Sequence, residues 1–307
     1  MVQIVLIHGI GQQASTAGEQ EAAWLPSLVK GVLASGHPDA AAVAARVAAS
    51  TGQNRPALAR MAFYGDLFLP TGTQGQEAPA FPAAQALAET LAAALLARAA
   101  VSDDPRLAAE AANALRQANP DRDGVQGLGA RARGAVAVLD GNAWLTARIF
   151  GALQKARKDL LQVTRYLTED DLRAAAQARV AALLGEDTKL VIGHSLGSVV
   201  AWEACQALDL PLPVLVTLGS PLGLDTVVYP RLRPQPPAWP PPVHRWVNVA
   251  HPDDIVAVDP DLRRLFPAPN GLTIESHTPP SKHEHHAAAG YLEEKATGHA
   301  AADALSG

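Results

Sequence analysis

The residues best suited to chemistry form the run Gly193-His194-Ser195-Leu196-Gly197, which has the pattern G-x-S-x-G. This run follows an apolar, strand-like segment at 189–192 and opens a helix-like segment at 195–208. A sharp turn between a strand and a helix strains the serine backbone, and the two glycines remove side chains that would clash with the neighbouring elements. Because these flanks argue against a chance serine in a turn, the pattern predicts a nucleophile at Ser195.

A serine that attacks a carbonyl requires hydrogen-bond donors for the negative charge that develops on the oxygen. The N–H group of Leu196 stands directly after the serine, at the start of the helix. A second strand-to-helix turn, His8-Gly9-Ile10-Gly11, offers the N–H group of Ile10. Alone, this second turn is equally consistent with an ordinary connection. Together with the serine turn it predicts an oxyanion hole formed by Ile10 and Leu196.

Four segments resemble the α/β-hydrolase superfamily, in particular its lipase-like bacterial members. They are the runs at 7–11, 193–198, 217–222 and 246–257, and the resemblance covers most of the chain outside a helical insertion. In similar hydrolases the last segment is a strand followed by a loop that carries an acid. Asp254-Ile255-Val256-Ala257 matches the family's Asp-x-Val-Ala pattern, so the resemblance implies Asp254 as the acid in preference to its neighbour Asp253. Asp225, which follows the preceding strand, is the alternative.

The base of such a triad is a histidine that follows the acid in the superfamily's chain order of Ser, Asp, His. A neutral imidazole near pH 7 suits general-base catalysis. The run from His286 to Leu292 resembles the histidine loop that opens the final helix in similar hydrolases, which implies His286 as the base. The other candidates after the acid are His285 and His283, the runners-up, and His277.

Two further features have simpler interpretations. The run His283-Glu284-His285-His286 could bind a metal, but adjacent residues on a loop rarely converge on one ion, so we expect no metal and no cofactor. His194, which precedes the predicted nucleophile, is expected to pack or donate a hydrogen bond. Cys205 lies among apolar residues of a helix and is expected to be a small buried hydrophobic residue.

The surrounding pattern alternates strands and helices, which predicts a parallel α/β sheet. The expected strands are at 2–7, 61–64, 189–192, 214–218, 246–249 and 272–274, with helices at 21–35 and 195–208. Residues from about 82 to 185 are rich in Ala, Leu, Arg and Glu with helical spacing, which predicts a helical insertion. Its last helix is expected to begin at a capping signal, Thr168 with Asp171 three residues on, and to end at Gly185.

These elements lead us to expect a single domain over residues 1–307. Its fold is the α/β-hydrolase fold, with a mostly parallel, doubly wound sheet and a helical cap insertion at about 82–185. The strand before His8-Gly9 is usually third in this fold but begins here at residue 2, so the first N-terminal strands would be missing. The shortened edge would then be covered or charged, and covering by oligomerisation is a hypothesis.

The composition limits the classes of function that this protein can have. Of the 307 residues, 48% are hydrophobic and 18% are charged, as in a globular protein, and the net charge of −5 indicates neither a nucleic acid nor an anionic membrane as partner. The N-terminal residues lack the features of a secretory signal. No apolar run long enough to span a membrane occurs. A single cysteine cannot form an intramolecular disulfide, and we expect a cytoplasmic protein.

Taken together, the sequence predicts a serine hydrolase that cleaves carboxylic esters through Ser195, Asp254 and His286. The expected substrate is a small-molecule ester with an apolar acyl group, in keeping with the Ala/Leu-rich insertion. Two alternatives stay open. One is an acyltransferase, thioesterase or peptide-processing enzyme with the same nucleophile. The other is an inactive hydrolase-like scaffold that binds a partner through the insertion and the proline-rich segment at 230–242.

Overall fold

The computed structural model describes residues 2–50, 58–69, 82–118, 128–150, 156–257, 259, 261–269, 271–280 and 286–306. The chain divides into two compact units, one formed by residues 1–65 and 175–307 and the other by residues 66–174. We name them the sheet unit and the helical unit, and each is described by itself. The helical unit, residues 66–174, overlaps the helical insertion expected at about 82–185 but begins and ends at earlier residues.

A parallel sheet forms the centre of the sheet unit. Its strands, among the residues described, are β1 (Ile4–Ile7), β2 (Ala59–Met61), β3 (Leu190–His194), β4 (Leu212–Leu218), β5 (Val243–Val249) and β6 (Glu275–His277). Their order is β2-β1-β3-β4-β5-β6, and every neighbouring pair is parallel. All residues of β1 and β3 are buried, as expected for apolar runs in a sheet with helices on both faces. The predicted parallel α/β sheet is confirmed.

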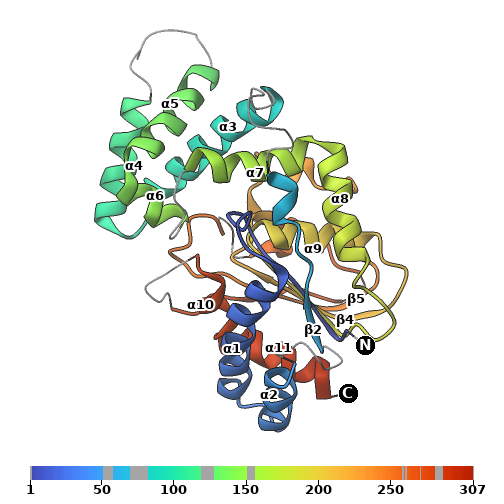
Figure 1. Ribbon diagram of the computed structural model, residues 1–307. Helices are drawn as coiled ribbons and strands as arrows, with labels where there is room; N and C mark the ends of the chain where they lie inside the picture. The colour runs from blue at the N-terminus through green and yellow to red at the C-terminus, as the bar shows by residue number, and fades with distance from the viewer. Residues whose placement is uncertain are drawn as a thin grey trace. The chain divides into compact units, whose positions relative to one another are not determined.

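Helices flank this sheet on both faces (Figure 1). On one face lie α1 (Ala17–Ala34), α2 (Ala40–Ala48) and α11 (Lys295–Ser306), while α9 (Leu196–Gln206) lies on the other. The core of the first face contains apolar residues of the strands together with residues such as Leu25, Leu28 and Leu305. Helix α1 begins with a capping box in which Thr16 and Glu19 bond to each other's backbone N–H groups.

Two strands differ in position from the sequence-based expectation. The second strand covers Ala59–Met61 instead of 61–64, and the last covers Glu275–His277 instead of 272–274. Ile274 is buried directly before β6, whereas the three residues of β6 are only half-buried or exposed. The apolar residues at 272–274 therefore indicated burial, and the pairing with β5 begins one residue later.

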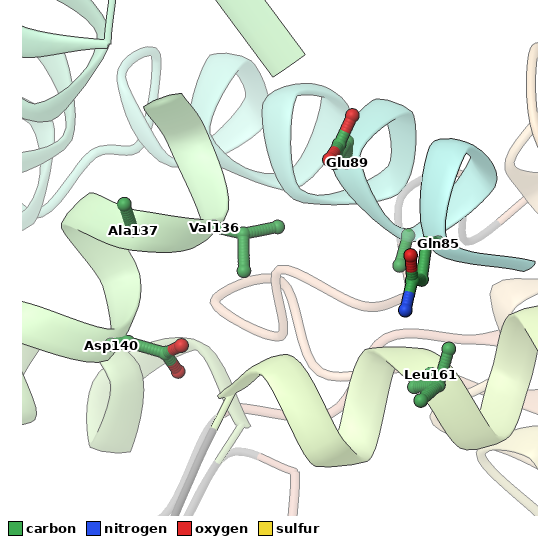
Figure 2. Close-up of a pocket in the computed structure, with 7 residues that line it drawn as sticks. Gln85, Glu89, Val136, Ala137, Asp140 and Leu161 are labelled. Atoms are coloured by element: carbon green, nitrogen blue, oxygen red, sulfur yellow. The ribbon is translucent and has the colours of Figure 1, made fainter. Parts of the chain in front are cut away.

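The helical unit consists, among its described residues, of α3 (Pro82–Ala99), α4 (Pro105–Gln117), α5 (Leu128–Gly141), α6 (Ala143–Phe150) and α7 (Ala156–Thr168). Helix α3 packs against α4, α5 and α7, and its buried residues recur at three- and four-residue spacing, which gives it one apolar stripe. Within this unit a cavity of about 490 Å³ lies between α3, α5 and α7 (Figure 2). Its lining is Gln85, Ala88, Glu89, Val136, Ala137, Asp140 and Leu161.

The capping signal expected at Thr168 is wrong. Thr168 is the last residue of α7, and its Oγ1 donates to the carbonyl oxygen of Thr164 at 2.7 Å. The next helix, α8 (Asp170–Ala181), follows after one residue, Glu169, whose carbonyl accepts from the N–H of Arg173. A threonine hydroxyl can bond backward within a helix as well as cap the next one, and here the backward bond forms. Helix α8 also ends at Ala181, before the expected end at Gly185.

None of the helices in the described ranges combines the length and the apolar character that crossing a membrane requires.

Candidate active site

The turn between β3 and α9 places Ser195 in a strained backbone conformation. Its φ of 53° and ψ of −128° make it the single non-glycine residue with positive φ among those the structure describes. The strain is held by neighbours on both sides, since the N–H of Ser195 donates to the carbonyl of Leu218 at 2.9 Å. The N–H of Ser198 in turn donates to the carbonyl of Ser195 at 2.9 Å. The strand and the helix therefore fix the serine backbone from either side.

The glycines around this turn are required by close packing. A Cβ atom at Gly193 would lie 2.5 Å from the carbonyl oxygen of Gly197. A Cβ atom at Gly197 would overlap the backbone carbonyl groups of Ile7 and His8, at the end of β1. The pattern of glycines in the sequence therefore reflects how closely α9 approaches both adjacent strands.

The side chains of Ser195, His286 and Asp254 form one hydrogen-bonded chain. His286 Nε2 lies 2.9 Å from Ser195 Oγ, and His286 Nδ1 lies 2.8 Å from Asp254 Oδ2. A carboxylate can only accept, so Nδ1 carries the proton and Nε2 accepts from the serine hydroxyl in the neutral imidazole. All three residues are buried, with 4%, 8% and 1% of their surface exposed in the order Ser195, His286 and Asp254. The structure thus brings together the three residues that the sequence analysis selected.

Asp254 is held in place by further hydrogen bonds. Its Oδ1 accepts from the N–H of Val256 at 2.9 Å, and its Oδ2 accepts from the hydroxyl of Tyr291 at 2.6 Å. Burial alone raises the pKa of this carboxyl group, but the charge and hydrogen bond of His286 and the donors from Tyr291 and Val256 outweigh it. The net pKa of Asp254 is therefore below its usual value, and the group is an anion at neutral pH.

Sequence reasoning did not single out Tyr291. This residue lies on the short helix α10 (Ala288–Leu292), five positions after His286, and is fully buried. Its hydroxyl accepts from the N–H of His251 at 3.0 Å. A buried tyrosine usually needs a partner for its hydroxyl, but the sequence does not show that this partner is Asp254, more than 30 residues earlier.

The two backbone donors proposed for an oxyanion hole lie beside the serine turn. A Cβ atom at Gly9 would be 2.8 Å from Ser195 Cβ, so the turn after β1 contacts the serine itself. Within the described part of the chain, the N–H groups of Ile10 and Leu196 donate to no protein acceptor. Leu196 N is the first amide of α9, where the helix leaves its N–H groups without intrahelical partners. Both donors are therefore available to a bound group.

His8 fixes the turn that carries Ile10. The N–H of Tyr64 donates to His8 Nε2 at 3.1 Å, and Nδ1 therefore carries the proton that is shared with the carbonyl of Gly9 at 2.7 Å. The Tyr64 hydroxyl donates to the carbonyl of His8 at 2.6 Å, and the two rings stack with their centroids 4.3 Å apart. Burial raises the pKa of Tyr64 far above its usual value, so this hydroxyl stays a donor.

His194 lies next to Ser195 but points to the backbone of the histidine loop. Its Nε2 is 2.9 Å from the carbonyl oxygen of His286, and the two imidazole rings have centroids 4.9 Å apart. Burial, followed by the positive charge that His286 can carry, lowers the pKa of His194 to about 3. His194 is therefore neutral across the physiological range and can donate to the His286 carbonyl.

The structure leaves the other sequence candidates outside the chain of hydrogen bonds. Asp225 is exposed, and Asp253 is half-buried. His277 ends β6 with 44% of its side chain exposed, 3.9 Å from Glu275. The runners-up His283 and His285 lie outside the described residues. Cys205 is buried in α9, and burial raises the pKa of its thiol to about 12, in keeping with an unreactive core residue.

The described residues contain no group of three or more His, Cys, Asp or Glu side chains that could hold a metal ion. Comparison of the chain with protein-family models, with curated proteins and with solved structures found no significant match. The functional argument therefore depends on the geometry of the site itself.

Proposed function

We propose that this protein is a serine hydrolase of the α/β-hydrolase type that cleaves carboxylic esters through a covalent acyl-enzyme. The observation that carries the proposal is the unbroken chain from Ser195 Oγ to His286 Nε2 and from His286 Nδ1 to Asp254 Oδ2, with lengths of 2.9 and 2.8 Å. The strained serine backbone supports it independently, because such strain persists only where the surrounding structure enforces it. The order Ser, Asp, His along the chain also agrees with this class.

In the first half of the reaction Ser195 is acylated. His286 Nε2 takes the proton of Ser195 Oγ as this oxygen bonds to the ester carbonyl carbon. The carbonyl oxygen becomes an oxyanion, which the N–H groups of Ile10 and Leu196 stabilise. The carbon–oxygen bond to the alcohol then breaks, the alcohol takes the proton from Nε2, and the acyl group stays on Ser195.

In the second half water replaces the alcohol. His286 Nε2 takes a proton from water as the water oxygen attacks the acyl carbon, and the second oxyanion occupies the same pair of N–H donors. The bond to Ser195 Oγ then breaks, the serine recovers its proton from Nε2, and the carboxylic acid leaves. Throughout, the anionic Asp254 holds the Nδ1–H of His286 and stabilises the imidazolium that forms twice in each cycle.

The chemistry of these groups favours a neutral carbonyl substrate. Two neutral N–H donors and a neutral imidazole suit attack on such a carbonyl, and the carboxylic ester, with its alcohol leaving group, is the substrate class of this proposal. The site triad contributes one negative charge, on Asp254, and this charge is paired with His286 and Tyr291. A neutral ester with an apolar acyl group therefore suits the site.

The decisive experiment combines turnover with covalent labelling. Hydrolysis of p-nitrophenyl esters of increasing acyl length is measured for the wild type, Ser195→Ala and the exposed control Ser306→Ala, alongside labelling by a fluorophosphonate. The wild type and Ser306→Ala are expected to turn over and label, while Ser195→Ala does neither, with a loss of roughly 10⁶-fold in kcat. A wild type that neither labels nor hydrolyses any of the esters would refute the proposal.

The same assay tests the base and the acceptor. His286→Ala is expected to lose activity, whereas His277→Ala, which removes an exposed histidine of the same region, is expected to keep it. If His286→Ala retains full activity, the base is His285 or His283 instead. Addition of a competing amine or alcohol then separates hydrolysis from acyl transfer, because a transferase forms the transfer product in excess even in water.

A further inference from the structure

Tyr291 is not only buried beside the triad but also hydrogen bonds to it. Its hydroxyl hydrogen bonds to Oδ2 of Asp254, the same oxygen that accepts from His286 Nδ1. We propose that Tyr291 is a positioning residue that holds this oxygen in place and keeps Asp254 anionic for His286. This inference depends on the proposed function, which supplies the reaction that the tyrosine supports.

The direction of the tyrosine's hydrogen bonds follows from its partners. The phenol has one proton, and the His251 backbone N–H, at 3.0 Å, can only donate to it. The phenol proton must therefore point to Asp254, at 2.6 Å. Burial and then the negative charge of Asp254 raise the pKa of Tyr291 well above its usual value, so the proton stays on the phenol at neutral pH.

The packing around the Tyr291 ring fixes the position of its hydroxyl group. Gly219, with a φ of 52°, lies where a Cβ atom would be 2.8 Å from Tyr291 Cε2 and 2.9 Å from Asp254 Oδ2. The ring of His251 stacks on the tyrosine with centroids 4.1 Å apart. The hydroxyl of Thr297 donates to the carbonyl of Tyr291 at 2.8 Å. A glycine, a stacked ring and a backbone anchor thus hold Tyr291 against the carboxylate.

The chain position of Tyr291 links it to the base. His286 and Tyr291 lie five residues apart, and both bond to the same oxygen of Asp254. Two residues of the segment 286–291 therefore donate hydrogen bonds to the Asp254 carboxylate. The bond from the Tyr291 hydroxyl limits rotation of this carboxylate away from the imidazole of His286. His194 adds a third restraint, since its Nε2 bonds to the carbonyl of His286 at 2.9 Å.

Among the residues that the structure describes, the charged and titratable groups that face Asp254 or the Tyr291 ring from the neighbouring elements are His286, His194, His251 and Glu294. A donor to a carboxylate stabilises the anion, so loss of the tyrosine hydroxyl makes the Asp254–His286 pair bind a proton more readily. The acid limb of the pH profile then moves to higher pH, because the pair is active only when it has lost that proton.

The test is Tyr291→Phe, which keeps the ring and removes the hydroxyl. We expect kcat for a p-nitrophenyl ester to fall roughly 10- to 100-fold with little change in KM, and the acid limb of kcat/KM to move to higher pH. The matched control is Tyr229→Phe, whose hydroxyl donates to the carbonyl of Leu265 at 2.8 Å. The control is expected to retain both the kcat and the pH profile of the wild type.

Two kinetic outcomes would overturn the inference. One is a Tyr291→Phe variant with wild-type kcat and pH profile. The other is a loss of kcat with an unchanged pH profile, which would mean that the hydroxyl only stabilises the fold.

A measurement without substrate separates this inference from the proposed function. The Nδ1–H proton of His286 is followed by low-field ¹H NMR, and its resonance is expected to shift in Tyr291→Phe but not in Tyr229→Phe. If the wild type hydrolyses no ester and yet this shift occurs, the proposed function fails while the positioning contact stands. If the wild type is active and the resonance is unchanged in Tyr291→Phe, the positioning role fails while the proposed function stands.

Discussion

Two groups of polar residues, one in each compact unit of this protein, differ in burial and pairing. In the sheet unit Ser195, Asp254 and His286 are buried and joined to one another by hydrogen bonds. In the helical unit, the carboxylates that line the cavity of Figure 2, Glu89 and Asp140, are half-buried and exposed. Buried polar groups persist only when paired in a fixed geometry. The contrast supports the proposal that Ser195, Asp254 and His286, and not the carboxylates of this cavity, form the reactive group.

Glycines at the serine turn and at the end of α5 differ in the space around them. Gly9 and Gly193 leave no space for a Cβ atom because they lie against residues of the serine turn, and Gly197 leaves none because it lies against the carbonyl groups of Ile7 and His8. In the helical unit, a Cβ atom at Gly141 would meet nothing within 4 Å. A glycine without space for a side chain is required by the structure, whereas one in open space is not. The glycines of the serine turn are consequently less tolerant of substitution than Gly141.

After the replacement of Ser195 itself, the largest expected effect is on the acid of the triad. Asp254→Asn leaves a neutral group that no longer fixes the proton on His286 Nδ1, so kcat is expected to fall by roughly 10⁴-fold. Steady-state hydrolysis of a p-nitrophenyl ester measures the loss. Asp225→Asn, at the exposed alternative position, is the matched control and should retain full activity. If Asp225→Asn instead loses activity while Asp254→Asn keeps it, Asp225 is the acid of the triad.

The next effect concerns space at the serine turn. A Cβ atom at Gly197 would overlap the carbonyl groups of Ile7 and His8, so Gly197→Ala is expected to lower the free energy of unfolding by about 3 kcal/mol or more. Gly141→Ala in the helical unit is expected to be neutral or to raise it by up to ~1 kcal/mol. Urea unfolding of both variants provides the comparison. Equal free energies of unfolding for the two variants would show that the backbone around Gly197 shifts at little cost to accommodate a Cβ atom.

The two units also differ in how much of their structure could be predicted from the sequence. The serine turn was predictable because a buried parallel strand is a continuous apolar run and because its turn requires glycine on both sides. Asp254 and His286 were selected by resemblance alone. Their contact joins two loops separated by more than 30 residues, and no local pattern specifies which of several aspartates and histidines will meet.

The helical unit was predictable only as a set of helices. The apolar stripe of α3 predicts that the helix packs on something, but Ala and Leu side chains do not specify whether the partner is α4, α5 or α7. Thr168 illustrates the same limit, because its hydroxyl can bond backward to Thr164 or cap the following helix. The position of β6 was missed for a related reason, since burial of Ile274 precedes the pairing with β5.

The third effect is on acid stability and comes from His194. In the folded protein its pKa is lowered to about 3, mainly by burial, whereas the unfolded chain has a value near 6.5. The unfolded state therefore binds a proton that the folded state does not, so stability is complete above about pH 6.5 and falls as the pH drops towards 3. At pH 5 this loss is ~2 kcal/mol.

His194→Gln tests this contribution, since glutamine keeps an N–H donor for the His286 carbonyl but does not titrate. Between pH 7 and pH 5 its free energy of unfolding, from urea titration, is expected to fall by ~2 kcal/mol less than that of the wild type. His244→Gln, at an exposed position of β5, is the control and should keep the wild-type slope. An unchanged slope in His194→Gln would mean that His194 is protonated without cost in the folded protein.

The smallest expected effect is in the helical unit, where the first turn of α4 depends on Asp104. Its Oδ1 accepts from the N–H groups of Arg106 and Leu107 at 3.0 and 3.1 Å, and Oδ2 pairs with Arg148. Asp104→Ala is expected to reduce stability by about 1 kcal/mol, whereas Asp104→Asn keeps an acceptor oxygen and loses less. Hydrogen exchange of the α4 amides measures the effect, with exposed Asp103→Ala as the control. The rate of fluorophosphonate labelling at Ser195 should not change, because the hydrogen bonds that join Ser195, His286 and Asp254 lie within the sheet unit. Slower labelling in Asp104→Ala alone would break the comparison, since it would couple the reactivity of the serine to a helix cap in the other unit.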